Sequence, residues 1–275
     1  MRIFSGLACA GLLGVILGLA PTLSFDGAGN KETFSAMSGG QAMRLAAENL
    51  KSGDKARAVR ALKLAAERGQ DQALWQLGRM FARGEGVPRD DYEAFKYYRK
   101  FADIHANTNP TGSLSRYVAD AFVQLGRYHL SGIPDSPVTP SPELAERMFT
   151  HAASYFGDPE AQYQLARLLL EGKAHDPKRA VPWLVLAANK QHYEAQALLG
   201  RILFRGELGR SQRAVGLMWL IVAFDGPGAN VPWIAELHED AFKQASDKER
   251  AQALLLLERW VGGRAASAYN FRDKN

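Results

Sequence analysis

Four arginines recur at one position of a repeated pattern, and arginine is the side chain best suited to binding carboxylates. They are Arg79, Arg127, Arg167 and Arg201. A guanidinium presents a rigid fork of N–H donors that matches the two oxygens of a carboxylate. Four such groups in a row repel one another unless acidic groups neutralise them. Those acids belong either to this chain or to a partner, and the sequence leaves both interpretations open.

Three aromatic residues accompany these arginines, namely Trp75, Tyr128 and Tyr163. The residues that dominate protein interfaces are enriched in Trp, Tyr and Arg, although most aromatic rings in a helical protein pack in its interior. Our hypothesis is that these seven residues line a concave groove that meets an acidic patch of a protein partner. We then expect charge reversal at Arg127 and Arg167 to weaken binding without unfolding the chain.

The six histidines predict no metal site, because no two of them stand at a ligand-pair spacing on one helix. His129 and His151 fall within helical patterns and are candidates for sensing acid, since histidine titrates with a pKa of about 6.5. The alternative is that both are ordinary surface or groove residues.

No other motif predicts catalysis or a cofactor. There is no Walker loop and no Gly-x-Ser-x-Gly elbow, and Gly84-x-Gly86 follows no strand. The one cysteine, Cys9, lies in a predicted targeting segment, so the mature chain is expected to have no thiol. The 275 residues carry a net charge of +5 without a long basic run, which does not favour nucleic acid as a partner. We therefore expect no enzymatic activity, cofactor or metal.

The arginines belong to a repeated helical pattern. Each copy reads Ala, then Leu at +4, Gly or Ala at +5, Arg at +6 and Gly at +11, starting at Ala73, Ala121, Ala161 and Ala195, with a degenerate copy at Ala42. On a helix the Ala and Leu share one face, the small residue permits close approach, and the last Gly ends the helix. The Arg points about 120° away from the Ala, outside the core.

A second helical pattern follows each copy, which gives a helix pair of about 34 residues, as in tetratricopeptide-like arrays. We predict an all-α, right-handed solenoid of about five pairs over residues 41–224. Residues 225–262 form a C-terminal helical cap, and residues 263–275 form a frayed tail. Polar insertions at 104–114 and 133–140 are predicted loops.

The N-terminus is typical of an export signal. Arg2 precedes an apolar run from Leu7 to Leu19, and small residues at Thr22 and Ser24 favour cleavage before Phe25. We predict a signal peptide at 1–24, a flexible N-terminus at 25–40 and a periplasmic location. The alternative is an uncleaved membrane anchor.

Two sets of residues resemble known families. Gly84-Glu85-Gly86-Val87-Pro88-Arg89-Asp90, followed by Ala94 and Tyr97-Tyr98, resembles the Sel1-like repeat signature, and the resemblance covers roughly residues 40–224. The segments 132–138, 153–157 and 160–166 are similar to the exopolysaccharide-production negative regulators of rhizobia-like bacteria.

That second resemblance implies a periplasmic repressor. Such a protein binds the sensor region of a membrane histidine kinase, holds the two-component system off and so restrains exopolysaccharide synthesis while permitting motility. A periplasmic protease relieves the inhibition, and the turn at 82–89 and the loop at 107–113 are candidate cut sites. The alternatives are a general Sel1-type envelope scaffold with other clients, and an exported hydrolase, for which the sequence holds no nucleophile–base or metal constellation.

Overall fold

The computed structural model describes residues 36–172, 175–209 and 211–272, and every regular element within these ranges is a helix. The predicted signal peptide at 1–24 and the N-terminal segment up to residue 35 lie outside the described residues. In the described ranges, no helix combines the length and the apolar character that a bilayer crossing requires.

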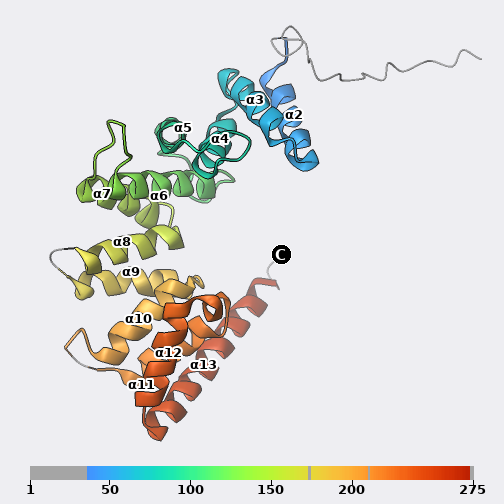
Figure 1. The fold of residues 1–275 in the computed structure, drawn as a ribbon. Helices are drawn as coiled ribbons and strands as arrows, with labels where there is room; N and C mark the ends of the chain where they lie inside the picture. The colour runs from blue at the N-terminus through green and yellow to red at the C-terminus, as the bar shows by residue number, and fades with distance from the viewer. Residues whose placement is uncertain (1–35, 173–174, 210, 273–275) are drawn as a thin grey trace, which may run out of the picture. The chain divides into compact units, whose positions relative to one another are not determined.

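Five consecutive helix pairs make up most of the described chain (Figure 1). They are α2 (Gly39–Ser52) with α3 (Lys55–Glu67), α4 (Asp71–Arg83) with α5 (Asp91–His105), α6 (Ser115–Ser131) with α7 (Pro142–Ser154), α8 (Pro159–Glu171) with α9 (Pro177–Asn189), and α10 (Tyr193–Arg205) with α11 (Arg213–Phe224). The second helix of each pair packs against the first helix of the next pair. This arrangement confirms the predicted α-solenoid.

A side-chain cap followed by a proline begins three of the helices. Ser141, Asp158 and Asp176 each accept a backbone N–H of the first turn, and each precedes a proline at the first helical position. At the other end, Gly84 and Gly206 terminate α4 and α10 with φ values of 68° and 74°. Side chains other than glycine rarely adopt this conformation, so glycine sets the end of these two helices. At the end of α8 the equivalent Gly172 is extended, with a φ of −67°, and does not require glycine.

The repeated small residue permits close contact within a pair. A Cβ on Gly126 of α6 would lie 2.4 Å from the ring of Phe149 on α7, well inside van der Waals contact. The alanine and leucine of the pattern are buried in every copy, as Ala121 and Leu125 illustrate. The apolar stripe and the close approach together dock each first helix onto its partner.

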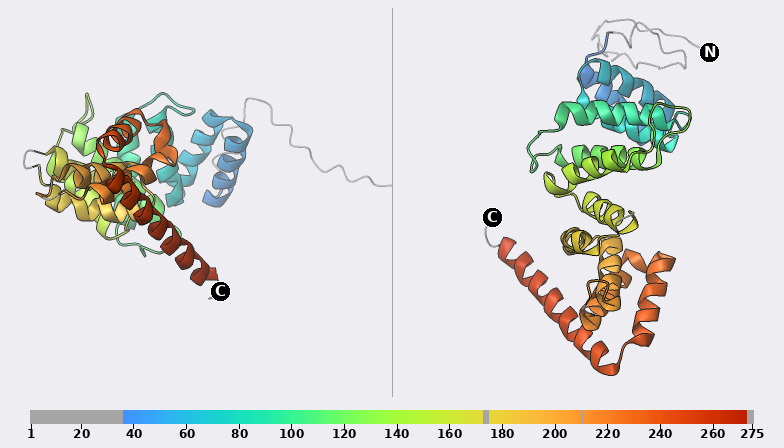
Figure 2. Two further views of the ribbon diagram at one scale, coloured as in Figure 1. Left: turned by 90° about the horizontal axis from the view of Figure 1, so that it is seen from below. Right: turned by 90° about the vertical axis from the view of Figure 1, so that its left-hand side faces the viewer.

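Two helices follow the last pair. A short 3₁₀ turn, η1 (Pro227–Asn230), leads into α12 (Pro232–Gln244) and then α13 (Asp247–Arg272), and both helices pack on α11 (Figure 2). The rings of Trp219 on α11 and Trp260 on α13 have centroids 5.5 Å apart. Helix α13 continues past Gly262, where the sequence suggested a frayed tail. Glycine keeps its backbone N–H, so it weakens a helix by about 1 kcal/mol without forbidding it.

Candidate functional site

The four repeated arginines lie on the first helices of successive pairs, and the structure divides them into two groups. Arg79 on α4 and Arg127 on α6 line one groove. Arg167 on α8 and Arg201 on α10 lie outside that groove and pair with acidic residues of their own chain. The predicted column therefore lines this groove only over part of its length.

The groove holds about 510 Å³ and lies between α4 and α6, with α5 and the turn that precedes it contributing further residues. Its charged lining consists of four guanidiniums and two carboxylates, so its formal charge is positive. The lining residues are Trp75, Arg79, Ala82, Arg83, Arg89, Asp91, Tyr98, Asp120, Gln124, Arg127, Tyr128, Ser131 and Gly132.

Both carboxylates in the groove already have hydrogen-bond partners. The guanidinium of Arg89 donates to both oxygens of Asp91, at 3.2 and 2.9 Å, and the Tyr128 hydroxyl lies 3.3 Å from one of them. Asp120 accepts the indole N–H of Trp75 at 2.6 Å and the side-chain amide of Gln124 at 3.0 Å. Asp91 is therefore paired with Arg89, whereas the donors to Asp120 are neutral and leave its negative charge in the groove.

Arg79 has no ion-pair partner in the part of the chain that the structure describes. Its Nε atom is buried without a hydrogen-bond acceptor, and its guanidinium lies 5.2 Å from the centroid of the Trp75 ring. Arg83, one turn further along α4, is 60% exposed and lies 3.8 Å from Glu85. Unpaired guanidiniums in a cleft are donors suited to carboxylate or phosphate oxygens, with which they form strong hydrogen bonds.

Arg127 has a structural partner. Its Nη2 atom donates to Glu160 of α8 at 2.5 Å, and Glu160 also contacts Gln164 at 2.7 Å and His192, the N-cap of α10, at 2.9 Å. Burial alone would raise the pKa of Glu160. This effect is outweighed by hydrogen bonds from His192 and Gln164 and by the positive charge of Arg127, which together lower the pKa to about 2. This carboxylate therefore joins three successive repeats.

The other two arginines are engaged in a similar way. Arg167 forms a two-pronged contact with Glu171 on its own helix, at 2.8 and 2.9 Å, and Arg201 lies 3.3 Å from Glu207. Arg201 also borders a small space closed by α12, where Leu237 and Asp240 lie. For three of the four predicted arginines, acids of this chain supply the neutralising charge.

The predicted aromatic residues divide in the same way. Trp75 and Tyr128 line the groove. Tyr163 does not join them, because it is 8% exposed and stacks on His192 with ring centroids 4.6 Å apart. Burial raises the pKa of Tyr163 to about 12, so its hydroxyl stays protonated. Tyr163 is a packing residue between repeats rather than a contact surface.

The two candidate pH-sensing histidines lie outside the groove. The ring of His129 packs edge-on against Phe95, and burial, aided by the charge of Arg99, lowers its pKa below 6.5. His151 on α7 places its Nε2 atom 3.0 Å from the carbonyl oxygen of Ala106 and so ties the loop after α5 to α7. Among the described residues, no cluster of three or more His, Cys, Asp or Glu side chains is arranged to hold a metal ion.

Several groove residues lie outside the repeat pattern. Arg83 follows Arg79 by one helical turn, so helical spacing alone could have identified it. Arg89, Asp91 and Asp120 enter the groove from a turn and from two other helices, and no local pattern relates them to Arg79.

Comparisons with known proteins fit this architecture. The Sel1 repeat family model matches residues 71–104, 119–154, 159–192 and 194–225, which are the four pairs from α4 to α11. The chain is 36% identical over 211 residues to the "Exopolysaccharide production negative regulator" of Rhizobium meliloti (strain 1021), covering 75% of this chain and 76% of that protein. The protein of the same name from Rhizobium leguminosarum bv. viciae is 36% identical over 210 residues, with the same coverage.

A solved structure supports the fold. The crystal structure of a Sel1 repeat protein from Oxalobacter formigenes aligns with a TM-score of 0.58 at 23% identity, over 86% of this chain and 93% of that chain.

Proposed function

The chain belongs to the Sel1 repeat family, and from this we infer that it is a non-catalytic negative regulator that acts by binding another protein. The observation that carries the inference is the 36% identity to two exopolysaccharide production negative regulators over three quarters of both chains. Sel1 repeats act as protein-binding scaffolds, and this chain adds a positively charged, aromatic groove on its first helices.

The proposed partner is the extracytoplasmic sensor region of a membrane histidine kinase. In this proposal the chain is exported to the periplasm by its N-terminal signal and holds the kinase in its inactive state. Exopolysaccharide synthesis then stays low and motility is permitted. The groove supplies the contact surface, because the guanidiniums of Arg79 and Arg83 can each donate hydrogen bonds to a carboxylate of the partner.

Proteolysis is the proposed route by which inhibition ends. The loop at 107–113 is the better of the two candidate cut sites, because its hydrogen bonds are local, such as those that Asn109 accepts from Thr111 and Gly112. The turn at 82–89 is anchored more firmly, since Gly86 packs against the backbone of Lys55 on α3. Because repeats depend on neighbour contacts, a cut at 107–113 separates α5 from α6 and frees the N-terminal pairs.

The test is in-cell photo-crosslinking with a benzophenone amino acid in place of Ala82, which lines the groove, and of Arg60, which is exposed on α3. We expect the Ala82 position to form one dominant adduct, identified by mass spectrometry as a kinase sensor region. The Arg60 position serves as the control. A mixture of envelope proteins at Ala82 would favour the general scaffold, which is the alternative function.

A genetic test complements the crosslinking. Deletion should raise exopolysaccharide and reduce motility, and Arg83→Glu should reproduce part of that phenotype at normal protein level, whereas Arg60→Glu should not. Charge reversal at Arg127 and Arg167 is a poorer test than the sequence suggested, because both arginines pair with acids of their own chain. A deletion strain with unchanged exopolysaccharide would contradict the proposal.

A further inference from the structure

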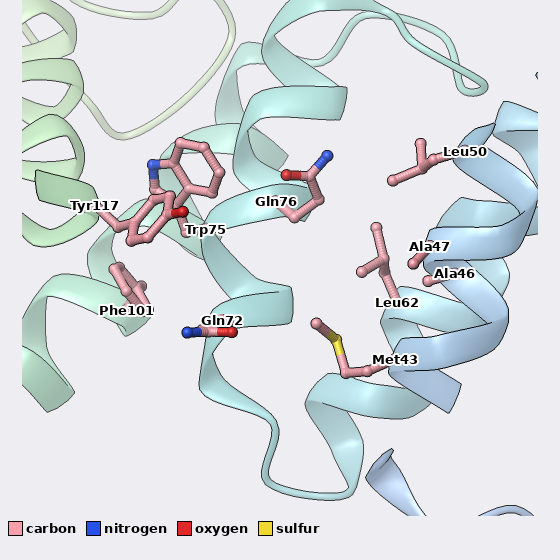
Figure 3. Close-up of a pocket in the computed structure, with 10 residues that line it drawn as sticks. All are labelled: Met43, Ala46, Ala47, Leu50, Leu62, Gln72, Trp75, Gln76, Phe101 and Tyr117. Carbon is pink, nitrogen blue, oxygen red and sulfur yellow. The ribbon is translucent and has the colours of Figure 1, made fainter. Parts of the chain in front are cut away.

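A second cavity lies beside the arginine groove, between the first and second pairs. It holds about 200 Å³ and is lined by α2, α3, α4, α5 and α6 (Figure 3). In Figure 3 the rings of Trp75 and Tyr117 stand together on one side, and the aliphatic side chains of α2 and α3 face them. The lining residues are Met43, Ala46, Ala47, Leu50, Leu62, Gln72, Trp75, Gln76, Phe101 and Tyr117.

This pocket is apolar and suits a large hydrophobic side chain. Its polar groups are the amides of Gln72 and Gln76 and the ring substituents of Trp75 and Tyr117, and none of its lining side chains is charged. A dry cavity of about 150 Å³ lined by aliphatic and aromatic groups is large enough to bind benzene. A pocket of about 200 Å³ therefore has room for an aromatic or branched aliphatic side chain.

Trp75 joins this pocket to the arginine groove, because it lines both. Its ring is held in place on two sides. Its indole N–H donates to Asp120 at 2.6 Å, and the ring of Tyr117 packs edge-on with a centroid distance of 4.7 Å. One fixed ring therefore separates an apolar compartment from a basic one along α4, where Gln72 precedes Arg79, and Gln76 precedes Arg83, by about two turns.

The electrostatics of the basic compartment select the charge of the occupant. Asp91 and Asp120 are already hydrogen-bonded, whereas Arg79 lacks an ion-pair partner in the described ranges and the contact of Arg83 with Glu85 is long and exposed. A carboxylate next to Arg79 would accept hydrogen bonds from the outer nitrogens of that guanidinium, which line the groove. A cationic side chain there would be repelled.

We propose that the two compartments form one site for a partner segment in which a large apolar side chain stands next to acidic residues. The apolar side chain occupies the pocket between α2, α4 and α6, and the neighbouring carboxylates contact Arg79 and Arg83. This proposal rests on the proposed function, since it specifies the chemistry by which that surface recognises a protein.

The site explains why the first pair is part of the array even though the Sel1 repeat matches begin at residue 71. Without α2 and α3, half of the apolar pocket is missing and only the arginine groove remains. The first pair therefore supplies selectivity for an apolar side chain, and the second and third pairs supply selectivity for charge.

The test uses the full mature chain and three fluorescein-labelled peptides built on one Gly/Ser framework. The first peptide carries Leu-Phe followed by Asp-Glu, the second carries Leu-Phe followed by Asn-Gln, and the third carries Ser-Ser followed by Asp-Glu. Fluorescence anisotropy gives the dissociation constants. We expect the first peptide to bind at least about tenfold more tightly than either of the others.

Protein variants assign each preference to its compartment. Arg79→Gln should weaken the first peptide about tenfold and leave the second unchanged. Ala47→Leu, which places extra carbon in the pocket from an exposed position on α2, should weaken both Leu-Phe peptides and leave the third unchanged. Arg60→Gln is the matched control, because Arg60 is exposed on α3 away from both compartments. If Arg79→Gln does not fold, Arg83→Gln tests the same preference from a more exposed position.

Equal binding of the three peptides, or an equal loss in the Arg79→Gln and Arg60→Gln proteins, would overturn the inference. Failure of this inference can be distinguished from failure of the proposed function. A kinase adduct in cells together with equal peptide binding would refute only the two-compartment site. A deletion strain with normal exopolysaccharide together with selective peptide binding would refute only the regulatory role.

Discussion

Replacing Glu160 with glutamine removes the one carboxylate that contacts three successive repeats. Glu160 lies at the start of α8, receives a hydrogen bond from Arg127 of α6 and contacts His192 at the start of α10. Glutamine keeps the size of the side chain and one acceptor oxygen but removes the negative charge. The substitution therefore isolates the electrostatic contribution of this contact to the stability of the array.

The magnitude follows from the pKa of Glu160. Its pKa falls from the ordinary value of 4.5 to about 2 in the folded chain, and each pKa unit corresponds to about 1.36 kcal/mol. The full shift would give about 3.4 kcal/mol, but the side chain is 36% exposed and solvent screens the interaction. We therefore expect Glu160→Gln to reduce the free energy of unfolding by about 1–2 kcal/mol at neutral pH.

The pH dependence has a defined sign. Because folding lowers the pKa of Glu160, the native chain gains this stability above pH 4.5 and loses it as the pH falls toward 2. Urea unfolding, followed by far-ultraviolet circular dichroism at several pH values, should show the difference between wild type and Glu160→Gln shrinking over that window. Glu171→Gln is the control, because Glu171 is 60% exposed and its pair with Arg167 lies within one helix.

Two results would refute this reasoning. One is a Glu160→Gln protein as stable as wild type at neutral pH, which would mean that desolvation of the carboxylate cancels its contacts. The other is a difference from wild type that persists unchanged down to pH 2, which would mean that the glutamine disturbs packing rather than charge. An equal loss of unfolding free energy in Glu171→Gln would show that the contact between repeats stabilises the chain no more than an ion pair within one helix.

Three further predictions concern packing, cleavage and protonation. Gly126→Ala should destabilise the chain by about 1–2 kcal/mol in urea unfolding, because the added methyl group collides with the phenylalanine ring on α7. Gly40→Ala, with open space at its Cβ, should not destabilise it. Limited digestion with a protease of broad specificity should cut first within 107–113, and mass spectrometry showing a first cut inside a helix would contradict this. Burial lowers the pKa of His129, so its ring should titrate below pH 6.5 when followed by NMR. The free energy of unfolding should then fall as the pH drops below 6.5, because the unfolded chain binds the proton more readily. A measured pKa above 6.5 would contradict the burial argument.

The sequence alone determined the helix pairs. Alanine and leucine at fixed helical spacing, a small residue beside the leucine and a terminal glycine are local signals, and each acts through its own helix or its immediate partner. The C-terminal ends of α4, α6, α8 and α10 each fall at the repeated glycine, and the starts of α8 and α10 fall at the capping residues Asp158 and His192. The starts of α4 and α6 have no side-chain cap. The position of the arginines outside the core follows from the same geometry.

Only the tertiary structure decided which arginines are available for binding. Arg127 and Glu160 are 33 residues apart and lie on different helices, so no local spacing relates them. The apolar pocket draws on five helices, and Trp75 gains its place between the two compartments from Asp120 and Tyr117 on α6. Ion pairs and cavities depend on how side chains from separate helices meet, and that depends on the packing of the whole array rather than on any one repeat.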